Sequence, residues 1–108
     1  MNIKIRFTGE LRNIFNKEEI ILQIEEKERE VTLKSILNEF LKMQDIDKNS
    51  IIKILLDSNA NGNDIKHEDL NSTTIILINE FDYRVFEGLD TKIKENDIIT
   101  LIPTIHGG

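Results

Sequence analysis

The stretch IITLIP, residues Ile98 to Pro103, decides the fold. Apolar residues occupy both faces of this run, which is typical of a strand at the centre of a sheet. Because Pro103 lacks the backbone N–H that a ladder needs, regular pairing is expected to end there. Five residues, TIHGG, follow it. The sequence therefore predicts a central strand that releases a short C-terminal tail.

Four earlier segments have the composition of strands. IKIRF and EIILQIE alternate apolar and polar residues, which predicts two half-buried strands. TTIILIN is rich in β-branched residues and predicts a buried strand, and YRVFEG follows closely enough to form a hairpin with it. The segment between the first two strands, Thr8 to Lys17, is expected to be a hairpin-like connection. The four segments are residues 3–7, 19–25, 73–79 and 83–88.

One amphipathic helix is predicted in VTLKSILNEFLKM, residues 31–43. Thr32 is expected to be its N-cap, with the hydroxyl accepting a hydrogen bond from an otherwise unpaired N–H of the first turn. The apolar residues recur at helical spacing, which places them on one stripe. They are Leu33, Ile36, Leu37, Phe40 and Leu41.

The predicted order is strand, strand, helix, irregular segment and three strands. One helix on one face of a mixed sheet is an α+β two-layer sandwich, and an order with the first and last strands at the centre fits the β-grasp (ubiquitin-like) fold. We therefore expect a single β-grasp domain over residues 1–103 and a flexible tail over 104–108. Residues 45–72 are interpreted as irregular and as a candidate insertion. Within them NSIIKILLD, residues 49–57, is either a short helix or a buried strand.

Composition excludes several classes of protein. The chain has 108 residues, no cysteine and a net charge of −6, which excludes a disulfide framework, a zinc–thiolate site and a cysteine nucleophile. An acidic chain is a poor direct binder of nucleic acid. No apolar run approaches the roughly 20 residues that cross a bilayer, and the N-terminus lacks the pattern of a signal peptide. A cytoplasmic protein without membrane attachment is therefore expected.

The tail has the chemistry of an acyl group that is presented to another protein. Gly107 and Gly108 have no Cβ, so they can enter a channel that excludes side chains. Five extended residues span roughly 17 Å, and the terminal carboxylate belongs to Gly108. A carboxylate becomes a good acyl donor once ATP converts it to an acyl-adenylate, and this sequence contains no phosphate-binding loop or catalytic constellation. We expect no catalytic residue and no bound cofactor here, with ATP and Mg²⁺ used by an activating partner.

The last 32 residues resemble the ubiquitin-related modifier family. Its signature is a Leu-Ile-Asn strand, an Asp-aromatic turn, a Leu-Asp dipeptide, a polar turn with Asp, and a strand that runs into His-Gly-Gly. The match here has no gap in its spacing. The matching residues are Leu77-Ile78-Asn79, Asp82-Tyr83, Leu89-Asp90, Asp97 and Thr104 to Gly108.

The resemblance implies a β-grasp sulfur carrier that can also be a protein modifier. It implies that a ubiquitin-activating-type enzyme adenylates Gly108 and recognises His106 and Gly107 in the tail. A rhodanese-type sulfurtransferase would then convert Gly108 to a thiocarboxylate. The sulfur would go to thiolation of the tRNA wobble uridine, or the tail would form an isopeptide bond with a target lysine.

Two alternatives stay open. The small subunit of molybdopterin synthase and the thiamine-pathway sulfur carrier share this fold and the Gly-Gly end, so the chain could be an enzyme subunit of that kind. A non-catalytic β-grasp interaction module would instead have an inert tail. His106 favours the modifier family, because the molybdopterin subunits more often carry a small residue at that position.

A second motif lies in DSNANGNDIKHE, residues 57–68, which has the spacing of a calcium loop. Its affinity should be weak, because only two of its ligands are carboxylates, and Asp64 stands where such loops hold an apolar residue. A plain asparagine-rich loop is the alternative, and we expect no metal site. His67 is expected to be a surface residue. The candidate ligands are Asp57, Asn59, Asn61 and Glu68.

Overall fold

A computed structural model describes residues 1–25, 30–43, 48–56, 65–71 and 73–103 of the chain. Its five strands are β1 (Asn2–Phe7), β2 (Glu19–Gln23), β3 (Ile75–Ile78), β4 (Phe81–Asp82) and β5 (Ile98–Ile102). Its helices are α1 (Gly9–Phe15), α2 (Leu33–Leu41) and α3 (Lys48–Leu55). Three short 3₁₀ helices are η1 (His67–Asp69), η2 (Tyr83–Val85) and η3 (Gly88–Asp90).

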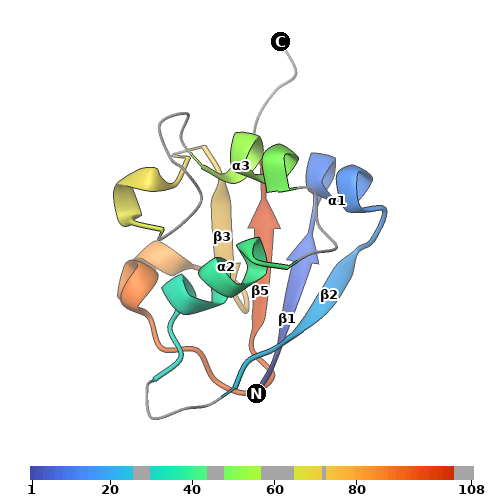
Figure 1. The fold of residues 1–108 in the computed structure, drawn as a ribbon. Coiled ribbons are helices and arrows are strands. Elements are labelled where there is room, and N and C mark those ends of the chain that lie inside the picture. Colours follow the sequence, from blue (N-terminus) through green and yellow to red (C-terminus); the bar gives the residue numbers. More distant parts are fainter. Residues whose placement is uncertain (26–29, 44–47, 57–64, 72, 104–108) are drawn as a thin grey trace.

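The strands form one mixed sheet in the order β2-β1-β5-β3-β4, so β5 lies at its centre. β5 pairs in parallel with β1, with Arg6 opposite Thr100, and antiparallel with β3, with Leu77 opposite Thr100. β1 also pairs antiparallel with β2. The prediction of a central last strand beside the first strand is therefore confirmed. Figure 1 shows α2 crossing in front of this sheet.

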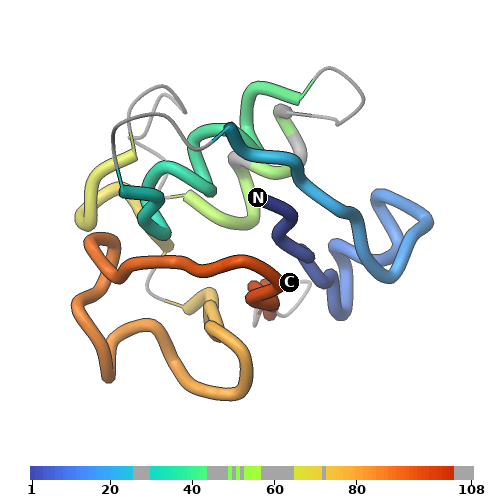
Figure 2. Tube along the Cα trace, turned by 90° about the horizontal axis from the view of Figure 1, so that it is seen from below, coloured from blue at the N-terminus to red at the C-terminus, as the bar shows by residue number. Residues whose placement is uncertain are grey.

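The core lies between the sheet and the helices, which cover one face only. Figure 2 shows α2 and α3 on the same side of the strands. The inward side chains of β5, Ile99 and Leu101, are fully buried, whereas Ile98, Thr100 and Ile102 on its other face are partly exposed. β5 is therefore the central strand that its double apolar pattern predicts, but only its inner face is covered. Its outward apolar residues belong to an open surface.

Helix α2 begins where its sequence predicts. The Thr32 hydroxyl accepts a hydrogen bond from the backbone N–H of Ser35 at 3.2 Å, and the Ser35 hydroxyl accepts one from the N–H of Thr32 at 2.9 Å. Such a reciprocal cap stabilises a helix by about 1 kcal/mol. The predicted stripe is buried against the sheet and comprises Leu33, Ile36, Leu37, Phe40 and Leu41.

The segment predicted as a hairpin-like connection, Thr8 to Lys17, forms the helix α1 instead. Its buried Leu11 anchors it, and the Phe15 ring stacks on Phe7 with the ring centroids 4.4 Å apart. The helix ends at Asn16, whose backbone is left-handed. Packing of this apolar side against the core therefore outweighs the helix-weakening glycine at its first position.

Two other segments settle or correct predictions. NSIIKILLD falls on α3, where Ile51, Ile54 and Leu55 are buried, so the helical alternative holds. The hairpin after β3 is present, but its second strand is only Phe81–Asp82, and the predicted strand YRVFEG begins instead as the 3₁₀ helix η2. Among the described residues, no helix is long and apolar enough to span a membrane.

Candidate functional site

The predicted functional residues lie at the very end of the chain. His106, Gly107 and Gly108 belong to residues 104–108, which lie outside the described residues. What the structure places is the base from which they extend, Pro103 and the strand β5 before it. The position and direction of this base determine where the functional residues can reach.

The base of the tail is held on both sides. β5 is paired with β1 through Leu101 and with β3 through Ile102, one residue before Pro103. Strands paired on both edges exchange backbone hydrogen bonds with two neighbours, so their last residues are fixed in direction. Figure 1 shows that β5 points toward the end of the sheet where α1 and α3 lie. The tail thus starts from a fixed point at the centre of the sheet.

A second contact at this base comes from the turn between β1 and α1. The Thr8 hydroxyl donates a hydrogen bond to the Leu101 carbonyl oxygen at 3.1 Å. Gly9 has a left-handed φ of +54°, and a Cβ built on it would lie 3.7 Å from Cγ of Pro103. This Thr8–Gly9 brace was not predicted from the sequence, because it depends on the parallel pairing of β1 with β5. A Thr-Gly pair directly after the first strand was its only sequence signal.

The outer face of the sheet continues from this base as a partly apolar surface. We define the open sheet face as the outward side chains Ile75, Leu77, Ile98 and Ile102 of β3 and β5, all half-buried. The strand register places them side by side around Thr100. Lys4 and Arg6 lie on the same face, and Lys4 Nζ is 3.1 Å from Glu19 Oε2. Such a face can accept a partner protein that also holds the tail.

An aromatic cluster lies at the β4 edge of the sheet, the edge opposite β2. Phe81 and Phe86 are exposed, and their rings meet edge to face with centroids 6.3 Å apart. Between them the Asp82 carboxylate accepts hydrogen bonds from the Arg84 backbone N–H at 2.8 Å and from Arg84 Nη2 at 2.8 Å. These hydrogen bonds hold the pKa of Asp82 below its usual value. Burial raises the pKa of the adjoining Tyr83 phenol.

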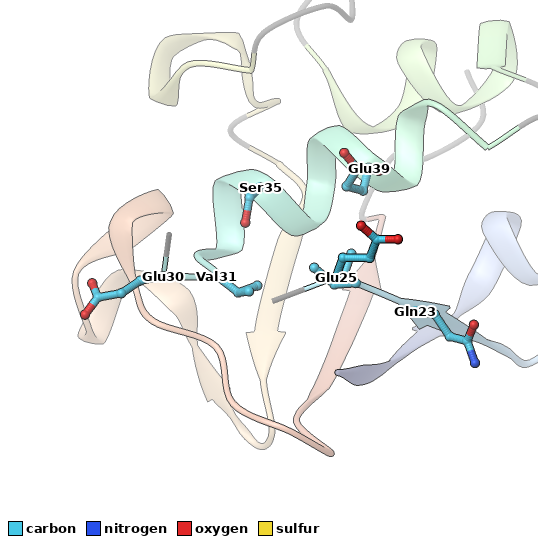
Figure 3. Close-up of a pocket in the computed structure, with 7 residues that line it drawn as sticks. Gln23, Glu25, Glu30, Val31, Ser35 and Glu39 are labelled. Atoms are coloured by element: carbon cyan, nitrogen blue, oxygen red, sulfur yellow. The ribbon is translucent and has the colours of Figure 1, made fainter. Parts of the chain in front are cut away.

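A groove of about 460 Å³ lies between the end of β2 and the start of α2 (Figure 3). Its lining carries the carboxylates of Glu25, Glu30 and Glu39, and the Ser35 hydroxyl there is already used by the α2 cap. Glu30 and Gln23 extend away from the groove at its two ends (Figure 3). Residues 26–29, which join its two sides, lie outside the described residues. The groove therefore has the character of a solvated acidic surface.

The candidate calcium loop falls largely outside the described residues, which omit 57–64. Glu68, its last candidate ligand, lies exposed in η1, and the expectation that this loop holds no metal stays a prediction. His67 beside it is exposed, as predicted. In the part of the chain that the structure describes, no group of three or more His, Asp or Glu side chains could hold a metal ion.

A mixed sheet with its first and last strands paired in parallel at the centre, and helices across one face, is the β-grasp or ubiquitin-like fold. A family model described as Urm1 (Ubiquitin related modifier) matches residues 2–108, so the chain belongs to the ubiquitin-related modifier family. The chain is therefore a ubiquitin-like sulfur carrier and protein modifier, as the resemblance implied.

One curated relative agrees with the family assignment in sequence, and two solved structures agree with the fold. The ubiquitin-related modifier 1 homolog of Dictyostelium discoideum is 28% identical over 111 residues, which cover all of both chains. The small archaeal modifier protein 1 of Methanosarcina acetivorans has a similar fold, with a TM-score of 0.70 at 23% identity over 99% of this chain and 96% of that one. Urm1 from Trypanosoma brucei has a TM-score of 0.61 at 20% identity, covering 99% and 95%.

Proposed function

We propose that the carboxylate of Gly108 is the reactive group of this protein and that a separate ubiquitin-activating-type enzyme activates it. The carboxylate oxygen attacks the α-phosphorus of ATP, and pyrophosphate leaves. ATP and Mg²⁺ are held by that enzyme, because this chain has no phosphate-binding loop. His106 and Gly107 form the stem that the enzyme recognises.

Sulfur transfer completes the proposed cycle. A rhodanese-type sulfurtransferase carries a cysteine persulfide, whose terminal sulfur attacks the acyl carbon of the Gly108 adenylate and expels AMP. A second thiol then reduces the acyl disulfide and releases the Gly108 thiocarboxylate. The sulfur serves thiolation of the tRNA wobble uridine, and an amine attack on the activated acyl group gives an isopeptide bond with a lysine. The cytoplasm is the expected compartment.

The observation that supports this proposal most is how firmly β5 and Pro103, which precede the tail, are held. β5 is paired with β1 up to Leu101 and with β3 up to Ile102, and the Thr8–Gly9 brace lies against Leu101 and Pro103. A partner that grips the open sheet face therefore receives the tail in a defined direction. Orientation of a reacting group before it enters an active site is a large part of catalytic rate enhancement. Presenting the carboxylate to an active site in this way needs a rigid base and an end without bulky side chains.

A molybdopterin-synthase or thiamine-pathway subunit would hold the base of its tail in the same way but would bind a different partner. Membership of the modifier family and the His106 side chain favour the sulfur carrier and modifier. Stable co-purification with a large synthase subunit would favour the alternative. An interaction module with an inert tail would keep all its partners after the last two residues are removed.

Exchange of labelled pyrophosphate into ATP tests the activation step. With the matched activating enzyme, the full chain should stimulate exchange, because adenylate formation is reversible. The chain without Gly107 and Gly108 should give only the background of enzyme alone. A truncated chain that stimulates exchange as well as the full chain would overturn the assignment of Gly108 as the reactive group.

A further inference from the structure

The exposed side chains of Phe81, Val85 and Phe86 form what we call the aromatic edge patch. We propose that this patch is a second docking surface for the enzyme that activates the tail, and that it fits an apolar pocket rimmed by lysine or arginine. The inference rests on the proposed function for the identity of the partner. It adds a contact separate from the tail and from the open sheet face.

The patch is exposed beyond what its residue types usually show. The exposed fractions are 61% for Phe81, 68% for Val85 and 47% for Phe86, and the four large exposed hydrophobic residues of the described chain include all three. Together they present roughly 300 Å² of apolar surface, given the 150–250 Å² of an aromatic side chain. Contiguous apolar patches of this size on a monomer often mark interaction sites.

The patch is also held in one shape. The buried Tyr83 fixes η2 to the core, and the Asp82 carboxylate caps η2 through the N–H of Arg84. The Phe86 N–H donates to the Tyr83 carbonyl oxygen at 3.2 Å, and this brings the Phe86 ring against Phe81. Aromatic anchors that are ordered before binding lose little conformational entropy when a partner covers them. The geometry is therefore that of a binding surface.

The charges around the patch select its partner. Glu80 and Glu87 flank it with exposed carboxylates, and neither carboxylate has a hydrogen bond or ion pair to another described residue. Between Glu80 and Glu87 the sequence has one cation, Arg84, which is paired with Asp82 at 2.8 Å and adds no net charge. This acidic rim complements lysine and arginine. It repels a second copy of this chain, whose net charge is −6.

The area and position of the patch indicate a partner that also holds the tail. A stable interface covers about 800 Å² on each side, so the patch supplies only part of one. Phe81 pairs with Ile78 in β3, which pairs with Ile99 in β5. At about 4.8 Å per strand and 3.3 Å per residue, Phe81 lies roughly 10 Å across the sheet from Ile99, and Pro103 lies roughly 13 Å further along the chain from Ile99. One protein bound to the tail can therefore reach the patch.

Steady-state activation by the matched activating enzyme tests the proposal. The double variant Phe81→Ser, Phe86→Ser should raise KM for the full-length chain about tenfold or more, as loss of an anchoring aromatic residue does, with kcat nearly unchanged because the tail is intact. The control is Ile21→Ser, an equally exposed apolar residue on the far strand β2 (54% exposed), which should leave KM close to that of the wild type. Circular dichroism and thermal unfolding confirm that each variant is folded.

A charge-reversal variant tests the acidic rim formed by Glu80 and Glu87. Glu80→Lys with Glu87→Lys should raise KM and should weaken its dependence on salt, because the attraction between unlike charges is screened by ions. A double phenylalanine variant that is folded and has the wild-type KM overturns the proposal. So does concentration-dependent dimerisation of the wild type through the patch, measured by sedimentation.

The two proposals fail in different ways. If the wild type is not adenylated at all, the proposed function is wrong, and direct titration of the enzyme with wild type and double variant still decides the patch. Equal affinities in that titration overturn the docking surface, and a loss of about tenfold supports it. If the wild type is adenylated and the double phenylalanine variant has the same KM as the wild type, only the docking surface is wrong.

Discussion

Two residues, one before α1 and one at its start, brace the last described residues of the chain. Thr8 donates its hydroxyl proton to Leu101, and Gly9 adopts a left-handed backbone beside Pro103. A residue with a Cβ loses about 1 kcal/mol in that backbone region. Its Cβ would make an ordinary contact with Pro103, so the cost at Gly9 is a backbone cost. The brace therefore depends on glycine for its shape.

Gly9→Ala should lower the free energy of unfolding by about 1 kcal/mol. Gly88→Ala is the matched control, because Gly88 also has positive φ, and a Cβ added there would meet nothing beyond its chain neighbours within 4 Å. Urea unfolding of the two variants should give similar losses, since both arise from backbone strain. A Gly9 variant as stable as the wild type would show that the left-handed turn is not maintained.

The sequence alone does not predict these individual side-chain contacts and exposures. Its patterns identify which residues are apolar, but five phenylalanines look alike in a sequence. Phe7 and Phe40 are buried, whereas Phe81 and Phe86 are exposed because a short strand and a capped 3₁₀ helix replace the longer strand that YRVFEG predicted. The Thr8–Gly9 brace joins residues more than 90 positions apart along the chain. Only the sheet register brings them together.

At the scale of elements, side-chain helix caps and apolar stripes determine which helices can be predicted from the sequence. α2 has a full apolar stripe and a Thr32 cap, so its start and its buried face were both predictable. α1 has only seven residues and begins on a glycine, so tertiary packing, which a sequence does not display, determines it. η2 is stabilised by the Asp82 side chain and not by a repeating pattern. Short elements of this kind escape periodicity analysis.

The Asp82 cap of η2 gives a pH dependence with a defined sign. Its folded pKa is lowered, first by the side-chain hydrogen bond with Arg84 and then by the backbone hydrogen bond with Arg84. The stabilisation is therefore complete above the ordinary value of 3.8 and is lost as the pH falls through the lowered pKa. A carbon-detected NMR titration should give Asp82 a pKa below the ordinary 3.8, and Arg84→Leu should raise it. An Asp82 pKa that is the same in the wild type and in Arg84→Leu would contradict the cap.

At the scale of the whole molecule, one sheet serves two purposes. Its inner face carries the core beneath α2 and α3, and its outer face is left partly apolar around the strand that bears the tail. The β-grasp order was predictable, because the first and last strands have clear patterns. Which face stays open was not, because IITLIP is apolar on both sides. The structure assigns the outer half of that pattern to a surface, which suits a protein that works by presenting its end to others.

The most direct test of the central claim is the mass of the intact chain after complete reaction. Incubation with ATP, the matched activating enzyme, its sulfurtransferase and a sulfur donor should add about 16 Da, since one sulfur replaces one oxygen at Gly108. The gain should map to the C-terminal peptide and should be absent from the chain that lacks Gly107 and Gly108. An unchanged mass with enzymes of verified activity would contradict the account.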